Sequence, residues 1–101
     1  MSIIKVTNDN FNEIKDSKYT VLIDFYADWC GPCRMLGPVL DEIANEKNDI
    51  AIGKVNVDND RELANSFGIR SIPTMIIFKN GVEVDRMVGF FNKDNILARL
   101  S

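Results

Sequence analysis

Residues 21–33 read VLIDFYADWCGPC, an apolar run followed closely by a pair of cysteines. The first six residues are apolar except for Asp24, which is typical of a central strand covered on both faces. After Cys30 the apolar residues recur at the spacing of a helix face: Met35, Val39 and Ile43, and Leu36, Leu40 and Ala44. The cysteines therefore lie where a buried strand ends and a helix begins, which indicates an α/β fold.

This helix contains Pro38 with Gly37 beside it. A proline inside a helix removes one hydrogen bond and clashes with the preceding turn, and glycine lowers helix stability. We therefore expect a kink at this point.

The rest of the chain predicts three further strands, of which residues 51–57 are expected to be an inner one. Residues 51–57 form one apolar run, and residues 74–78 and 82–88 flank Asn80-Gly81, the strongest short-range hairpin signal. With a less clearly marked first strand, the predicted order is βαβαβαββα. The first half requires parallel strands with right-handed crossovers and the end requires an antiparallel pair, so we expect a mixed sheet with helices on both faces.

Three more helices are expected, each with a residue that can cap its first turn. The capping candidates are Thr7 or Asn8, then Asp58 or Asn59, and finally Asn92. The apolar residues on these helices are Phe11 and Ile14, then Leu63, Ala64 and Phe67, and finally Ile96, Leu97 and Leu100. Gly68 is placed to end the middle helix.

Length and composition point to one domain over residues 1–101, because the chain has 101 residues of which 46% are hydrophobic. The net charge of −3 would repel a phosphate backbone, so nucleic-acid binding is not expected. The apolar runs are too short for a membrane span and the first residues do not resemble a secretory signal. We expect a cytoplasmic protein, in a compartment that keeps thiols mostly reduced.

Cys30 and Cys33 are spaced for a disulfide that opens and closes. Residues three apart on a helix have Cβ atoms about 5–6 Å apart, and a disulfide needs Cα atoms roughly 4.4–6.8 Å apart. The positive end of a helix stabilises a thiolate, so Cys30 is the predicted nucleophile. Cys33, one turn further in and more shielded, is the predicted resolving cysteine. Pro32 suits the first turn because its missing N–H has no helical partner there.

Three other interpretations of the pair are weaker. A structural zinc site needs four ligands, and the chain has two cysteines and no histidine, which leaves only a zinc ion shared across a dimer. A permanent disulfide across so short a loop would constrain the unfolded chain little. Two inert buried thiols would not need the start of a helix. The spacing and placement favour redox chemistry.

Asp24 is the only charge in its strand, and Lys54 in residues 51–57 is the candidate to face it. Burial would raise the pKa of Asp24, so that it could take the proton of Cys33 during exchange. The alternative is a solvated carboxylate on an edge strand with Lys54 on the surface. For Ile72-Pro73, which precedes a strand, the frequency of X–Pro bonds alone favours a trans peptide.

Residues 24–33, DFYADWCGPC, resemble the active-site segment of thioredoxins. The resemblance continues in order through Pro38, KVNVD at 54–58, FGIRSIPT at 67–74, FKNG at 78–81 and Val88-Gly89. A lone C-x-x-C motif is weak, but this set covers nearly the whole chain and is specific. Two departures are Tyr26, where many members have tryptophan, and Gly37, where many have alanine.

The resemblance implies a thioredoxin fold, a five-stranded mixed sheet and four helices in three layers. It also implies that Pro73 is cis and lies against the cysteines, and that Asp24 and Lys54 form a buried relay. The backbone at Ile72 would pair with the substrate chain. The implied apolar docking surface consists of Trp29, Val57, Ile72, Pro73, Gly89 and Phe90. Of Phe90 and Phe91, we expect at least one to belong to the core.

The implied activity is protein-disulfide reduction by a monomeric electron carrier acting on oxidised proteins. Gly31-Pro32 between the cysteines resembles the reducing members of the family. The chain has no G-x-G-x-x-G motif, so we expect no bound cofactor, no metal and a separate thioredoxin reductase as electron donor. The family's usual donor is a flavin enzyme that uses NADPH, although a ferredoxin-dependent donor stays open. The rivals are a disulfide oxidase or isomerase, and a binding module that uses the apolar surface within a larger complex.

Overall fold

A computed structural model describes residues 2–101. Its elements, in chain order, are β1 (Ile4–Lys5), α1 (Phe11–Lys15), β2 (Thr20–Tyr26), α2 (Gly31–Glu46), β3 (Ile50–Asn56), α3 (Arg61–Ser66), β4 (Thr74–Lys79), β5 (Val82–Val88) and α4 (Lys93–Leu100). The predicted order is confirmed, and the bounds of the four strands predicted by residue number differ by at most one residue at each end. The expected first strand exists but has only two residues.

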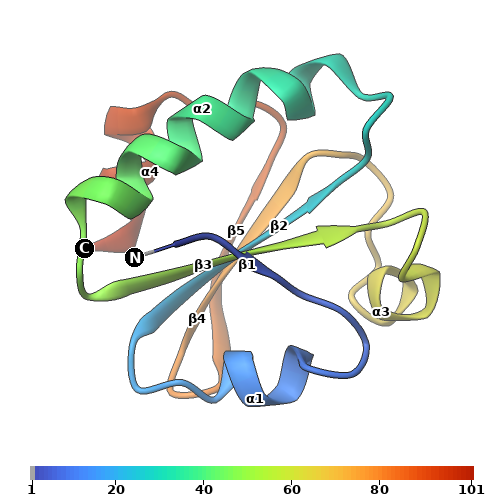
Figure 1. Ribbon diagram of the computed structural model, residues 1–101, viewed down its shortest axis with the longest axis horizontal. Coiled ribbons are helices and arrows are strands. Elements are labelled where there is room, and N and C mark those ends of the chain that lie inside the picture. The colour runs from blue at the N-terminus through green and yellow to red at the C-terminus, as the bar shows by residue number, and fades with distance from the viewer. Residues whose placement is uncertain (1) are drawn as a thin grey trace.

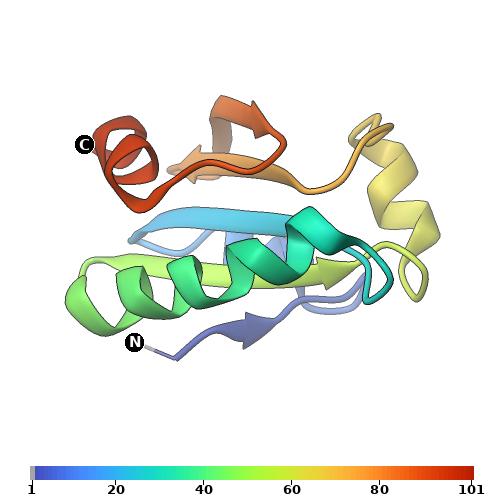
Figure 2. The same ribbon diagram turned by 90° about the horizontal axis from the view of Figure 1, so that it is seen from above.

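The sheet is mixed, as predicted, with the strand order β1-β3-β2-β4-β5. β1 and β2 run parallel to β3, and β2–β4 and β4–β5 are antiparallel pairs. Figure 1 shows α2 and α4 on one face of the sheet and α1 and α3 on the other, and Figure 2 shows α2 and α4 in front of the strands. β2 is therefore the central strand of a three-layer fold.

Two apolar cores, one on each face, explain why residues 21–26 are nearly all apolar. Leu22 belongs to the core under α2 and α4, whereas Val21, Ile23 and Phe25 belong to the core above α1 and α3. All four side chains are fully buried. Burial on both faces requires apolar side chains at successive positions of the strand.

The hairpin and the last helix follow their local signals. Asn80 and Gly81 both have positive φ, 55° and 78°, as the tight turn between β4 and β5 requires. The side chain of Asn92 accepts a hydrogen bond from the Asn95 N–H at 2.9 Å, which confirms it as the N-cap of α4. Gly68, with φ of 65°, follows the end of α3 as predicted.

The predicted caps of α1 are wrong, because this helix begins after Asn10 rather than after Thr7 or Asn8. The Asn10 side chain accepts a hydrogen bond from the Thr7 N–H at 2.7 Å, and the Thr7 hydroxyl accepts one from the Asp9 N–H at 3.2 Å. These side chains stabilise the loop before the helix, which is the competing use of capping residues.

The predicted caps of α3 are wrong for a similar reason, because its N-cap is Asp60 and not Asp58 or Asn59. The Asn56 side chain accepts a hydrogen bond from the Asp58 N–H, and the backbone N–H groups of Asn59 and Asp60 donate to the Asn56 carbonyl. These bonds close a turn directly after β3, so the helix begins later.

Two further features bear on the site. Pro38 lies inside α2 as predicted, and the kink there stays a prediction. Phe91 packs against the core under α2 and α4, whereas Phe90 is 42% exposed, so one of the two belongs to the core as expected. Within residues 2–101 no helix is long and apolar enough to cross a membrane.

Candidate active site

The cysteine pair lies between the end of β2 and the first turn of α2. Cys30 is the N-cap of α2, and Gly31 and Pro32 are the first two helical residues. Cys30 and Cys33 form a disulfide, with their Cα atoms 5.2 Å apart. The Cys33 N–H donates a hydrogen bond to the Cys30 sulfur at 3.2 Å, so that sulfur occupies the place of a capping oxygen. The spacing argument and the placement of Pro32 are confirmed.

The two cysteines are almost equally shielded in this oxidised form. Cys30 is 5% exposed and Cys33 is 3% exposed, so the predicted difference between them is small here. Both pack with Ala27 in a cluster that Val57 and Ile72 cover. The Cys30 sulfur lies 3.7 Å from the Ile72 carbonyl oxygen, which brings the segment before β4 directly against the disulfide.

Asp24 is completely buried in the central strand, six residues before Cys30. Neither of its carboxyl oxygens has a hydrogen-bond partner among residues 2–101. Burial raises the pKa of Asp24 from 3.8 to about 7, and the positive charge of Lys54 opposes that rise. The alternative of a solvated carboxylate on an edge strand is therefore wrong.

Lys54 lies directly beside Asp24 in the parallel register of β2 and β3. Its ammonium nitrogen sits 4.3 Å from the centroid of the Tyr26 ring, in a cation–π contact. Within residues 2–101 Asp24 forms no ion pair, so Lys54 acts on it through charge and not through a direct bond. The Tyr26 phenol has a raised pKa, because of burial first and the charge of Asp28 second.

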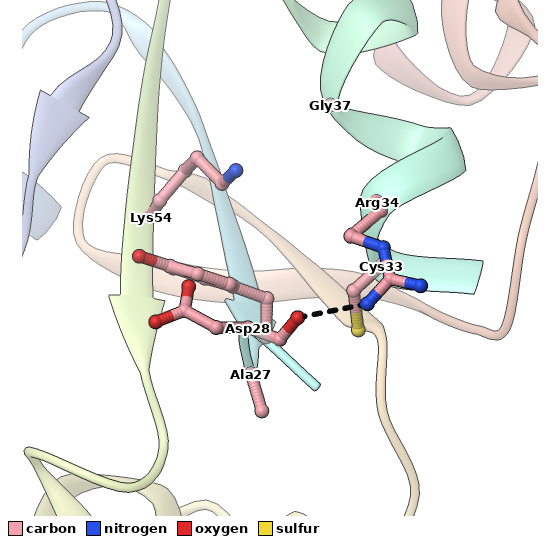
Figure 3. A pocket seen from close by; sticks show the side chains of 7 residues that line it. Ala27, Asp28, Cys33, Arg34, Gly37 and Lys54 are labelled. Carbon is pink, nitrogen blue, oxygen red and sulfur yellow. Dashed lines mark hydrogen bonds between the residues drawn. The ribbon is translucent and has the colours of Figure 1, made fainter. Parts of the chain in front are cut away.

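A hollow of about 360 Å³ opens between β3 and the start of α2. Figure 3 shows Lys54 on one side of this hollow and Cys33 and Arg34 on the other. The Arg34 guanidinium donates a hydrogen bond to the Asp28 carbonyl at 3.1 Å, which ties the first turn of α2 to the preceding loop. Lys54, which lies beside Asp24 in the sheet, and Cys33 therefore line the same surface hollow.

The Ile72-Pro73 peptide is cis, as the resemblance implies, so the trans peptide favoured by frequency alone is wrong. Pro73 is buried, and its carbonyl accepts a hydrogen bond from the Gly89 N–H at 2.8 Å. Gly89 has φ of 98°, a conformation that favours glycine. This bond joins the segment after β5 to the segment beside the cysteines.

The remaining predicted docking residues differ in exposure. Trp29 is 68% exposed, and its indole N–H donates a hydrogen bond to the Asp58 carboxylate at 2.8 Å. Val57 and Ile72 are half-buried against the cysteines, and Phe90 follows Gly89 on the surface. The structure thus brings Val57 and Ile72 to the disulfide from two separate segments of the chain, and Trp29 lines one hollow with both of them.

Sequence reasoning missed a second hollow of about 400 Å³, which Trp29 lines. Its lining includes Val57 and Ile72 from the predicted surface, and adds Arg61, Ala64, Asn65, Ile69 and Arg70. Arg70 could have been found from the sequence, because it lies two residues before Ile72 in a segment that the family resemblance covers. The residues from α3 gave none, because only the folded chain places them beside Trp29.

Comparison with known proteins agrees with this geometry. The sequence model of the thioredoxin family matches residues 2–101. The chain belongs to the thioredoxin family. Members of this family are thiol–disulfide oxidoreductases, and this chain is one, with Cys30 and Cys33 as its redox pair.

Individual relatives match over nearly their whole length. The thioredoxin of Chlamydia caviae is 49% identical over 96 residues, covering 95% of this chain and 93% of that protein. The thioredoxin of Pyropia yezoensis is 45% identical over 103 residues, covering 100% of this chain and 96% of that protein. The structure of a mutant thioredoxin from Halobacterium salinarum superposes with a TM-score of 0.92 at 35% identity, covering 98% of this chain and 88% of that one.

Proposed function

We propose that this protein, as a single domain of residues 1–101, reduces disulfides in other proteins and carries electrons to them. The observation that supports this most is the position of the Cys30 sulfur at the N-cap of a 16-residue helix, where it accepts the Cys33 N–H. Unpaired N–H groups and the helix dipole favour negative charge at this end. In the reduced protein they would lower the pKa of the Cys30 thiol and make it the nucleophile.

The first step joins the protein to its substrate. The Cys30 thiolate attacks one sulfur of the substrate disulfide, which breaks that bond and forms a mixed disulfide. The released substrate sulfur leaves as a thiolate and takes a proton from water. Gly31 and Pro32 hold the start of α2, and with it the orientation of both sulfurs, during this attack.

The second step releases the substrate and uses Asp24. Cys33 gives its proton to the Asp24 carboxylate, and the Cys33 thiolate then attacks the Cys30 sulfur. The second substrate sulfur leaves as a thiolate, the substrate has gained two electrons, and Cys30 and Cys33 form the disulfide. A buried carboxyl with a pKa of about 7 and no hydrogen-bond partner among residues 2–101 suits this exchange near neutral pH.

Lys54 and the hollow beside it support the return of that proton to water. Lys54 adjoins Asp24 in the sheet and lines the hollow that Cys33 also lines. Its positive charge favours the ionised form of Asp24, which is the form that accepts the next proton.

The substrate chain docks on the apolar surface around the disulfide. This surface consists of Trp29, Val57, Ile72, Pro73, Gly89 and Phe90. The Ile72 carbonyl, 3.7 Å from the Cys30 sulfur, is placed to accept a backbone hydrogen bond from a substrate beside its attacked cysteine. An extended substrate would then pair with the backbone of this segment as an added strand does.

A separate thioredoxin reductase returns the electrons, as the family resemblance implies. It would reduce the Cys30–Cys33 disulfide through the same surface, because both sulfurs are buried in the cluster that this surface covers. We further propose that the protein acts as a cytoplasmic monomer in electron transport, where its substrates are oxidised proteins.

Reduction of insulin disulfides with a small dithiol as electron source tests this function. The wild-type protein should accelerate the reaction, and the Cys30→Ser variant should not. With the dithiol left out, the reduced Cys33→Ser variant should accumulate a mixed disulfide with insulin, visible as the summed mass of the variant and insulin. Repeating the assay with NADPH and candidate reductases identifies the donor. Full activity of a Cys30→Ser/Cys33→Ser variant in cells would instead make binding the function.

A further inference from the structure

The hollow beside Trp29 extends from residues that pack against the disulfide to α3, and both apolar and basic side chains line it. Val57 and Ile72 line the part next to the cysteines, and Trp29 lines the same hollow. Two arginines also line it, Arg61 in the first turn of α3 and Arg70, together with Ala64, Asn65 and Ile69. Figures 1 and 2 show α3 at the same end of the sheet as the start of α2. We call this hollow the Arg61/Arg70 groove.

Neither arginine has a partner within residues 2–101. Five ion pairs are formed in this part of the chain, and none includes Arg61 or Arg70. Their side chains make no hydrogen bond there either, and both residues are exposed. By contrast, Arg86 and Arg99 are each held by a carboxylate. The two guanidinium groups in the groove are therefore free to bind an anion from outside.

Not all of the acidic residues close to Arg61 in sequence offset the positive charge of the two arginines. The Asp58 carboxylate holds the Trp29 indole N–H, and the Asp60 carboxylate accepts the Asn8 N–H and is nearly buried. Glu62 is exposed on α3 beside Arg61 in sequence but does not line the groove. Because the whole chain carries a net charge of −3, the two arginines in the groove are a local exception.

We propose that the Arg61/Arg70 groove binds a carboxylate side chain of the substrate, so that the protein selects disulfides with Asp or Glu a few residues from the attacked cysteine. Guanidinium groups match carboxylates in shape and hydrogen bonding. Arg70 is two residues before Ile72, so its Cα lies within about 7 Å of the Ile72 Cα. A substrate paired at Ile72 therefore passes close to these charges. This inference rests on the proposed function, because the groove selects only among disulfides that Cys30 attacks.

The test uses three synthetic peptides, each with one cysteine in a mixed disulfide with a nitrobenzoate thiol. The peptides are identical except that the residues two and three positions from the cysteine are Glu, Gln or Lys. Cys30 attacks the peptide sulfur and releases the coloured aryl thiolate, which reports the rate. The reduced protein is used without any other reductant, so each Cys30–Cys33 pair reacts once and the assay measures a second-order rate constant. At low salt this constant should be about three- to tenfold higher for the Glu peptide than for the Lys peptide, and the ratio should fall towards one with added salt.

The matched variants separate the groove from the net charge. Arg61→Glu/Arg70→Glu should invert the ratio between the Glu and Lys peptides. Lys18→Glu/Lys47→Glu changes the net charge equally, but both residues are exposed at the opposite end of the sheet, just before β2 and β3. This control should keep the wild-type ratio.

Two results would overturn the inference: equal rates for the Glu and Lys peptides with the wild-type protein, or the same inversion in the lysine control. If the wild-type protein reacts with none of the three peptides, including the Gln peptide, the proposed function itself fails.

Discussion

At the scale of single residues, the burial of Asp24 lowers the stability of the folded protein, and its proposed role in proton transfer explains why it is there. Its carboxyl is fully buried, lacks a hydrogen-bond partner among residues 2–101, and has a pKa of about 7. Each pKa unit corresponds to about 1.4 kcal/mol, so the rise from 3.8 costs the folded protein about 4 kcal/mol once this group is ionised in both states. Because an ionisable side chain at this buried position lowers stability, Asp24 does not serve the stability of the fold.

The direction of the Asp24 pKa shift predicts how the stability of the protein depends on pH. Below about pH 4 Asp24 is protonated in the folded and unfolded states alike. Between pH 4 and about 7 only the unfolded chain loses the proton, so the contribution of Asp24 to stability falls as pH rises and is fully lost above its folded pKa. Asp24→Asn should remove this part of the pH dependence. At pH 8 it should raise the free energy of unfolding by about 1–3 kcal/mol, because the unpaired amide offsets part of the gain.

Urea denaturation of the oxidised proteins across this pH range measures the effect. Asp41→Asn, on the exposed face of α2, removes the same charge and should change stability by less than about 0.5 kcal/mol. In the insulin assay Asp24→Asn should be slower than the wild type while Asp41→Asn is not. Unchanged or reduced stability of Asp24→Asn at pH 8 would show that Asp24 is not a desolvated carboxylate.

The sequence predicted which residues form the site, but not which contacts their side chains make. Asp24 and Lys54 were predictable, because a charge in a strand buried on both faces is anomalous. The position of the Lys54 ammonium over Tyr26 was not, because it depends on side-chain directions that the pattern does not contain. The cis peptide at Pro73 was predictable only from the family resemblance, since most X–Pro bonds are trans.

At the scale of elements, the helix starts show where local rules succeed and where they compete. Asn92 caps α4 as predicted, because its side chain accepts the N–H three residues later. Thr7 and Asp58 were plausible caps, but their side chains bind a neighbouring N–H and the Trp29 indole instead. The sequence therefore predicted that helices begin in these regions but not at which residue.

The α4 cap can be tested by two alanine variants. Asn92→Ala should lower the free energy of unfolding by about 1 kcal/mol, because the Asn95 N–H loses its acceptor. Asn95→Ala, an exposed position inside the same helix, keeps the cap and should be neutral or slightly stabilising. Thermal or urea denaturation measures both, and an equal loss in the two variants would show that the cap contributes nothing.

At the scale of the whole molecule, the hydrophobic pattern predicted the order of the elements and a mixed sheet, because each strand after the first and each helix carries its own signal. The docking surface and the Arg61/Arg70 groove could not be found in this way. They combine Trp29, Val57, α3 and the segment before β4, which meet only after the chain has folded. Sequence and structure both single out the Cys30 sulfur, at the end of the central strand and the start of α2.

The pH dependence of thiol alkylation in the reduced protein tests whether that sulfur is the nucleophile. Iodoacetamide should modify Cys30 with an apparent pKa clearly below the value of about 8.5 for free cysteine, because the start of α2 stabilises its thiolate. This reactivity should persist in Cys33→Ser and disappear in Cys30→Ser. An apparent pKa at or above that of free cysteine, or faster modification of Cys33 than of Cys30, would contradict the assignment of Cys30 as the attacking thiolate.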